Sequence, residues 1–95
     1  PQSDETANKW YALAAEQGIT AAQIAIGRFY SLDFLDSYDP VSAYMWFSIA
    51  VKLEDVDAMD KREFLSTRMT PEQIAEAEAR VSSWVNSHQA LFAGN

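Results

Sequence analysis

The sequence of 95 residues contains no cysteine and only three glycines. Without cysteine, the chain can form no disulfide, no thiolate metal site and no cysteine nucleophile. The glycines are Gly18, Gly27 and Gly94, and none belongs to a phosphate-cradling loop or to the Gly-x-Ser-x-Gly turn of many hydrolases. These absences favour a chain that is not an enzyme, and we expect no catalytic residues, no bound metal and no cofactor.

Basic residues are also scarce, because seven Lys and Arg face fourteen Asp and Glu and leave a formal charge of -7. Such a charge repels nucleic-acid phosphates and anionic membrane surfaces. The most apolar stretch, residues 41–51, is well short of the roughly 20 residues that cross a bilayer. We therefore predict no nucleic-acid partner and no membrane span.

The chain has enough apolar residues to fold, since 48% are hydrophobic and 13% are aromatic. Apolar residues recur three or four positions apart, which indicates amphipathic helices. Gly18 should end the first of them, Asp39 followed by Pro40 should begin the third, and Thr70 with Gln73 should form a capping box at the start of the last. The expected helices span roughly residues 4–17, 20–32, 40–53, 56–68 and 71–88.

Part of the first two helices returns later in the sequence at an offset of 36 residues. Five pairs match at this offset: Ala7 and Ala43, Trp10 and Trp46, Tyr11 and Phe47, Ala14 and Ala50, Ala22 and Ala58. Agreement at one fixed offset indicates a helical repeat, in which each unit buries its apolar face against the next.

The pattern of small and aromatic residues in this repeat resembles the Sel-1-like repeat, a relative of the tetratricopeptide repeat. The residues that carry the resemblance are Ala7, Trp10, Tyr11, Ala14, Ala15, Gly18, Ala22, Ile26, Gly27, Tyr30, Asp39 and Ala43. It implies an all-α fold, a right-handed α/α superhelix of antiparallel helical hairpins. Residues 1–95 would form a single domain at the C-terminal end of a longer array. The family also suggests an exported or periplasmic bacterial protein that acts as a non-catalytic scaffold for a protein or peptide partner.

In stacks of the kind that this chain resembles, the first helix of each repeat lines the concave face. Carried over by position, the inner face of the second helix would present Ala21, Ile24, Arg28 and Ser31. The 36-residue offset then adds Asp57, Asp60, Phe64 and Thr67 from the fourth helix. Such a groove would suit an extended peptide or a helix of complementary charge. An ordinary solvated surface accounts for these residues equally well.

Two other functions stay open. The first helix would leave apolar surface bare near Trp10 and Leu13, and together with Leu91 and Phe92 in the tail this suggests a homo-oligomerisation module. A carbohydrate-binding domain could instead use exposed aromatic rings. Most aromatic residues, however, lie at helical spacing and should pack the core: Trp10, Tyr11, Tyr30, Trp46, Phe47 and Trp84.

Two further patterns carry less weight. His88 is the single histidine and lacks nearby partners for catalysis or metal binding, so we interpret it as a partly buried structural residue. Gly27 lies in the middle of a helix, where glycine costs about 1 kcal/mol relative to alanine. We therefore expect a neighbouring helix to approach closely at Gly27.

Overall fold

The computed structural model describes residues 3–92, so the first two and last three residues of the expected 1–95 domain lie outside the described part. Within residues 3–92 the fold is all-helical, with five α-helices and no strand. The helices are α1 (Ser3–Glu16), α2 (Thr20–Tyr30), α3 (Pro40–Lys52), α4 (Asp57–Ser66) and α5 (Pro71–Ser87), followed by a 3₁₀ turn, η1 (Gln89–Leu91).

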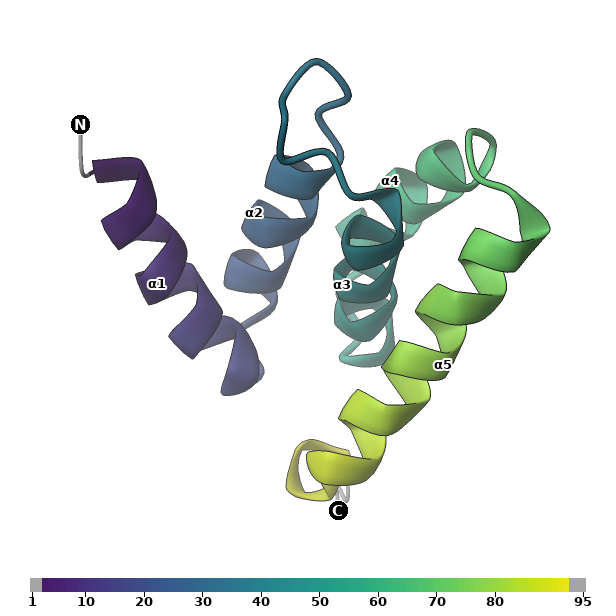
Figure 1. Ribbon diagram of the computed structural model, residues 1–95. Helices are drawn as coiled ribbons and strands as arrows, with labels where there is room; N and C mark the ends of the chain where they lie inside the picture. The colour runs from purple at the N-terminus through teal and green to yellow at the C-terminus, as the bar shows by residue number, and fades with distance from the viewer. Residues whose placement is uncertain (1–2, 93–95) are drawn as a thin grey trace.

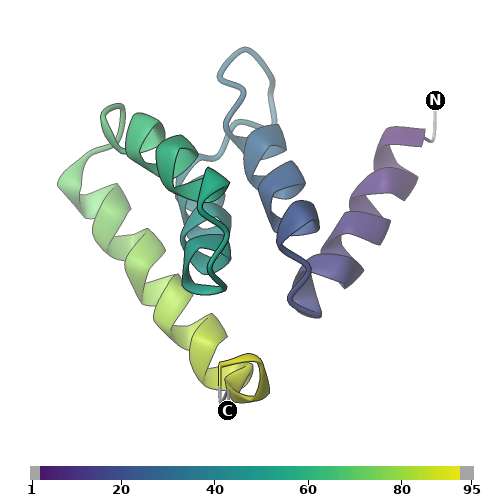
Figure 2. The same ribbon diagram turned by 180° about the vertical axis from the view of Figure 1, so that it is seen from behind.

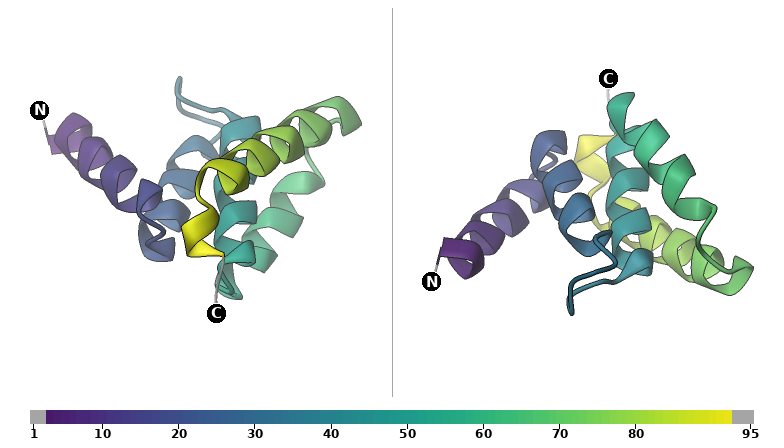
Figure 3. Two further views of the ribbon diagram at one scale, coloured as in Figure 1. Left: turned by 90° about the horizontal axis from the view of Figure 1, so that it is seen from below. Right: turned by 90° about the horizontal axis from the view of Figure 1, so that it is seen from above.

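The third helix, α3, lies at the centre of the molecule and packs against α2, α4 and α5 (Figure 1). Seen from behind, α4 covers α3, while α1 lies at the outer edge beside α2 (Figure 2). The views along the vertical axis show α1 diverging from the other helices (Figure 3). Successive helices run in opposite directions, so the connectors between them lie alternately at the two ends of the helices (Figure 1).

Two helix starts, those of α3 and α5, follow the capping chemistry expected from the sequence. At α3, the Ser42 amide donates to Asp39 Oδ1 at 3.2 Å, and Pro40 occupies the first turn. At α5, the Gln73 amide donates to Thr70 Oγ1 at 3.1 Å, and the Thr70 amide donates to Gln73 Oε1 at 2.9 Å. Both predicted caps are confirmed, because each side chain satisfies an amide that has no partner inside the helix.

Two helices end two residues earlier than expected, α2 at Tyr30 and α4 at Ser66, while the other three end within one residue of their expected ends. The Ser31 hydroxyl donates to the Arg28 carbonyl at 2.9 Å, and the Thr67 hydroxyl donates to the Phe64 carbonyl at 2.7 Å. Hydroxyls that bind nearby carbonyls offer the backbone an alternative to further helix. This local competition explains why the last turns close where they do.

Two connected clusters form the core, and α3 contributes to both. The first cluster joins Ala15, Ala22, Ile26, Trp46, Ile49, Val81 and Trp84. The second joins Val41, Ala43, Tyr44, Phe47, Leu65 and Ala77. Trp46 and Trp84 meet edge to face with ring centroids 5.9 Å apart, a favoured geometry for aromatic pairs.

The aromatic residues of α1 were wrongly placed in the core by their spacing. Trp10 is 70% exposed and Tyr11 is 44% exposed, because α1 packs mainly against α2 and turns its other side outward. Bare apolar surface near Trp10 and Leu13 was also predicted, and it is present. No helix among residues 3–92 combines the length and apolar character needed to span a membrane.

Candidate functional site

A hollow of about 220 Å³ lies between α2 and α4, and we call it the α2–α4 hollow. Its lining residues are Arg28, Ser31, Phe47, Lys61, Phe64, Leu65 and Arg68. Phe47 and Leu65 belong to the buried core and supply apolar lining. Arg28, Lys61 and Arg68 add three cations, although the whole protein carries a formal charge of -7.

The fourth helix presents one face to this hollow because Leu65 anchors it. Leu65 is only 4% exposed and packs in the second core cluster. Lys61, four positions before Leu65, shares its side of the helix, and Arg68 follows in the turn after Ser66; both line the hollow. Phe64, next to Leu65, is 67% exposed and offers a large apolar ring to solvent.

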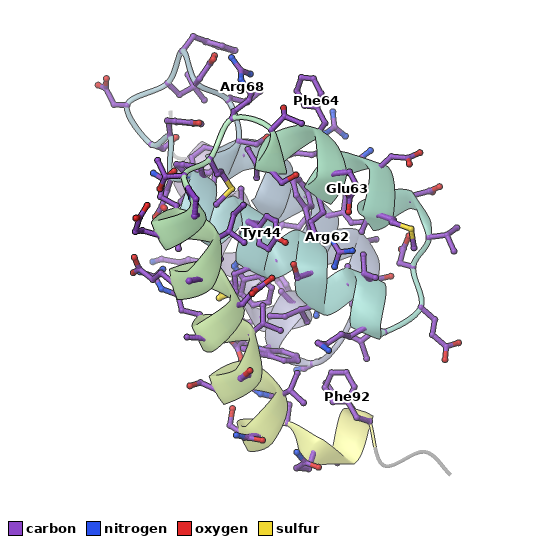
Figure 4. The ribbon with its side chains drawn as sticks, turned by 90° about the vertical axis from the view of Figure 1, so that its right-hand side faces the viewer. Tyr44, Arg62, Glu63, Phe64, Arg68 and Phe92 are labelled. Atoms are coloured by element: carbon purple, nitrogen blue, oxygen red, sulfur yellow. The ribbon has the colours of Figure 1, made fainter. Side chains whose placement is uncertain are left out.

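The cations of the hollow differ in their partners. Arg68 pairs with Asp33 at 2.8 Å, and its guanidinium lies 5.9 Å from the Phe64 ring centroid. Figure 4 shows Phe64 and Arg68 near the same end of α4. Among the ion pairs of the described residues, none involves Arg28 or Lys61. Two of the three cations are therefore available to an incoming anion.

Three of the eight residues predicted for a concave face line the hollow, namely Arg28, Ser31 and Phe64. Ala21 is exposed in the first turn of α2, outside the lining. Ile24 is partly buried and packs against the second core cluster, so it lies outside the lining of the hollow.

The other three predicted residues of α4 lie outside the lining. Asp57 and Asp60 are exposed in the first turn of α4, and Thr67 is exposed just after the helix. Asp60 lies five positions before Leu65, which turns it away from that side of the helix, and Thr67 lies beyond the last residue of α4. The hollow thus contains no carboxylate from α4.

Sequence reasoning missed Lys61 and Arg68. The sequence contains a signal for both residues. Leu65 lies in a strongly charged segment, and the residues four positions before it and three positions after it are basic. The prediction transferred positions from α2 to α4 by the sequence offset, which assumes that both helices turn the same face toward the groove. It therefore selected the adjacent stripe of α4. Phe47 was missed because its side chain crosses from α3 into the hollow.

The chemistry available in the hollow is recognition by charge and apolar contact. Arginine and lysine donate hydrogen bonds to carboxylates, and the exposed Phe64 ring can pack against an apolar side chain. Among residues 9–92, whose side chains the structure describes, no three His, Asp or Glu gather closely enough to hold a metal ion.

No family model, no curated protein and no solved structure matches this chain. Membership of the Sel-1-like repeat family therefore stays a prediction that rests on the residues given above.

Proposed function

We propose that this chain is a non-catalytic protein-interaction module and that the α2–α4 hollow binds an acidic segment of a partner protein. The observation that carries the proposal is the group of three cations, Arg28, Lys61 and Arg68, around apolar lining in an otherwise acidic protein. A local basic site in an acidic molecule favours a partner of the opposite local charge.

The geometry of the cations suits carboxylates held on a peptide. Arg28 and Lys61 have no ion pair within the described part of the chain, so a bound carboxylate would give them one. The Arg68 and Asp33 side chains are each 49% exposed, and such surface pairs contribute little stability. A partner carboxylate can therefore replace Asp33 without a large loss.

The size of the hollow favours a peptide segment over a whole small molecule. Pockets that enclose drug-sized ligands have volumes of about 300–1,000 Å³. The 220 Å³ hollow is smaller and accommodates one or two side chains of a longer chain. An aromatic or aliphatic residue between two acidic ones would fill it, with the apolar side chain against Phe64.

The repeat architecture proposed from the sequence supports the same location. In the repeat proposed from the sequence, α2 and α4 would be the first helices of two successive units, and the hollow lies between them. In a right-handed superhelix of such units this would be the inner face, where tetratricopeptide-like stacks, which this chain resembles, hold extended peptides.

Peptide selection followed by charge reversal tests the proposal. A random-peptide display library is selected on the purified domain, and binding of the enriched peptides is measured by fluorescence anisotropy. We expect peptides with Asp or Glu beside an apolar residue. The double variant Arg28→Glu/Lys61→Glu should bind them at least about tenfold more weakly, because two charge-assisted contacts become repulsive.

The matched control is Arg80→Glu, which reverses an exposed arginine on α5 outside the hollow. It should leave peptide affinity unchanged, and circular dichroism should show that both variants are folded. Equal weakening by both variants, or enrichment of peptides without acidic residues, would contradict the proposal.

A homo-oligomerisation module is the second candidate, and the exposed α1 surface favours it. Trp10 is 70% exposed and Leu13 is 62% exposed on the same helix. If this surface joins two copies, light scattering should show a mass that rises with protein concentration, and Trp10→Glu should abolish the rise. A constant monomer mass would remove this candidate.

A carbohydrate-binding domain has less support. Trp46, Phe47 and Trp84 are buried in the core and unavailable for stacking on a sugar. Of the exposed aromatic residues, Trp10 and Tyr11 lie on α1, Phe64 lies on α4, and Phe34 lies in the connector between α2 and α3.

A further inference from the structure

The connector between α2 and α3, residues 31–39, is an acidic loop that carries an exposed aromatic ring. Its charged residues are Asp33, Asp36 and Asp39, and it contains no Lys or Arg. Phe34 is 77% exposed, and Figure 1 shows the loop projecting beyond the ends of α2 and α3. Large apolar side chains that fill a pocket on a second molecule supply much of the energy of protein association.

Backbone hydrogen bonds fix the shape of this connector. The Asp39 amide donates to the Tyr30 carbonyl at 2.8 Å and closes the base of the loop. The Leu35 amide donates to the Leu32 carbonyl at 3.1 Å, which defines a tight turn with Phe34 at one of its two corner positions. A ring that is already held in this way costs little further ordering when it binds.

The connector has the composition proposed above for a ligand of the α2–α4 hollow, because Phe34 lies between Asp33 and Asp36. Asp33 pairs with Arg68, a lining residue of the hollow, at 2.8 Å, and this contact holds the connector at the rim. Phe34 is outside the lining and largely exposed, so its ring does not enter the hollow of its own chain. The ring is therefore available to the hollow of another molecule.

The other charges of the connector and of the hollow are complementary. Asp36 is exposed and takes part in no ion pair among the described residues. Arg28 and Lys61 in the hollow have no ion pair there either. A carboxylate that meets these two cations gains charge-assisted contacts without breaking an existing pair, while the exposed Phe64 ring offers apolar contact beside them.

The connector and the hollow lie next to each other on one face of the molecule, since Ser31 of the connector also lines the hollow. Two molecules that meet through this face can each insert a loop into the other. Such reciprocal contacts make a closed two-fold dimer, in which each subunit uses the same surface patch.

We propose that two copies of this chain associate in this way. Each inserts Phe34 into the α2–α4 hollow of the other and brings Asp36 to Arg28 and Lys61. The inference rests on the proposed function, because it identifies the acidic segment bound by the hollow as the connector of a second copy.

Sedimentation equilibrium measures the association directly. One loop in one hollow, made twice, is a small interface, so the dimer should be weak and should form only at high protein concentration. Between about 10 μM and about 1 mM, the mass should rise from 10.7 kDa toward twice that value. A constant monomer mass over this range would overturn the proposal.

Two aromatic truncations identify the surface that associates. Phe34→Ala should weaken the dimer at least about tenfold, because it removes the ring from both inserted loops. The matched control is Trp10→Ala, at a residue of α1 that is 70% exposed, and it should leave the mass unchanged. Circular dichroism should show that both variants are folded. Association that is lost in Trp10→Ala and kept in Phe34→Ala would overturn the proposal in favour of the α1 surface.

An exchange of charges tests the contact between Asp36 and the cations. Asp36→Lys alone and Arg28→Glu/Lys61→Glu alone should each stay monomeric, because like charges would meet in both halves of the dimer. In an equimolar mixture of the two variants, each loop meets a hollow of opposite charge, so association should return to within about tenfold of the wild type. A mixture that stays monomeric would overturn the pairing.

Peptides selected on the domain separate this inference from the proposed function. Excess peptide should dissociate the wild-type dimer, because the peptide and Phe34 occupy the same hollow, and a dimer that persists with peptide bound would overturn the inference. Peptide binding by a chain that stays monomeric would contradict the second copy alone and leave the hollow as a peptide site. Association that depends on Phe34, without enrichment of any peptide, would support the second copy and contradict the peptide proposal.

Discussion

Gly27 shows how one small residue permits the central packing of the molecule. A Cβ atom built on Gly27 would lie 2.5 Å from Cε1 and 2.7 Å from Cδ1 of Phe47. Phe47 is 2% exposed and its ring is rigid, so it cannot move aside cheaply. The close approach expected at Gly27 is confirmed, and the residue that approaches is an aromatic ring of α3.

We predict that Gly27→Leu destabilises the protein by at least about 2 kcal/mol. The gain in helix propensity is about 1 kcal/mol, whereas overpacking a filled core costs about 1–3 kcal/mol for even small additions. A leucine adds four heavy atoms against Phe47, so the steric cost should exceed the gain. Thermal unfolding should show a melting temperature lower by roughly 8 °C or more.

Ala21→Leu is the control, since it adds a similar side chain at an exposed position of the same helix. It should change the melting temperature little. If Gly27→Leu unfolds at the same temperature as the wild type, the packing of Phe47 on Gly27 is incorrect.

At the scale of elements, the turns after α1 and α3 share a backbone feature at the offset that relates these two helices in the sequence. Gly18 ends α1 with φ +90°, and Glu54 follows α3 with φ +73°. The two residues are 36 positions apart, the same offset that pairs Trp10 with Trp46. Both turns therefore use a left-handed residue, although only the first turn has the glycine that adopts it without strain.

We predict that Glu54→Gly stabilises the protein by about 0.5–1 kcal/mol. A residue with a Cβ loses roughly 1–2 kcal/mol in the left-handed conformation, and part of this is offset by the greater freedom of glycine in the unfolded chain. Urea denaturation should show a higher midpoint with an unchanged slope.

The control for charge is Glu54→Ala, which removes the carboxylate but keeps the Cβ. It should give no comparable gain. If the alanine variant gains as much stability as the glycine variant, the carboxylate, and not the backbone, limits the stability of this turn.

How far the sequence predicts each element depends on whether its signal is local. The caps at Asp39 and Thr70 were predicted correctly because a few adjacent residues determine them. The face of α4 was predicted less well, because it depends on where Leu65 finds space among residues of α3 and α5. Of the predicted groove residues on α4, only Phe64 lines the hollow.

The scale of the whole molecule adds contacts that no local pattern could predict. η1 folds back so that Leu91 lies over Gly18, where an added Cβ would be 2.9 Å from Leu91 Cδ1. Phe92 packs against the first core cluster and meets Trp84 at 6.3 Å between ring centroids. The sequence suggested that Leu91 and Phe92 are surface for self-association, whereas the structure places Leu91 over the turn between α1 and α2 and packs Phe92 against the first core cluster.

Glu16 and His88 form a further contact between the same two regions, although they are 72 positions apart in the sequence. Glu16 Oε1 lies 2.9 Å from His88 Nε2 and accepts a hydrogen bond from Trp84 Nε1 at 3.2 Å. The His88 ring stacks on Trp84 with centroids 3.7 Å apart, and its Nδ1 lies 2.7 Å from the Trp84 carbonyl oxygen. The predicted structural role of His88 therefore includes a distant partner, which joins the end of α1 to the end of α5.

Glu16 and His88 are in direct contact, so we predict that the losses of stability caused by Glu16→Ala and His88→Ala are not additive. Each should destabilise the protein by about 1 kcal/mol, a value kept small because Glu16 is 53% exposed. The double variant should lose at least about 0.5 kcal/mol less than the sum, as expected for residues in contact. Chemical denaturation measures all three values, and hydrogen exchange should accelerate at the end of α5 and in η1.

Glu76→Ala supplies the comparison, because it removes an exposed pair with Arg80 within one helix, at 2.6 Å. That pair spans a single turn, so its loss should cost only about 0.3–0.5 kcal/mol and should leave exchange in η1 unchanged. If Glu16→Ala behaves like Glu76→Ala in both measurements, the C-terminal turn is held by Leu91 and Phe92 alone. A difference between the two variants would instead identify Glu16 as the polar contact that ties the splayed α1 helix to the rest of the stack.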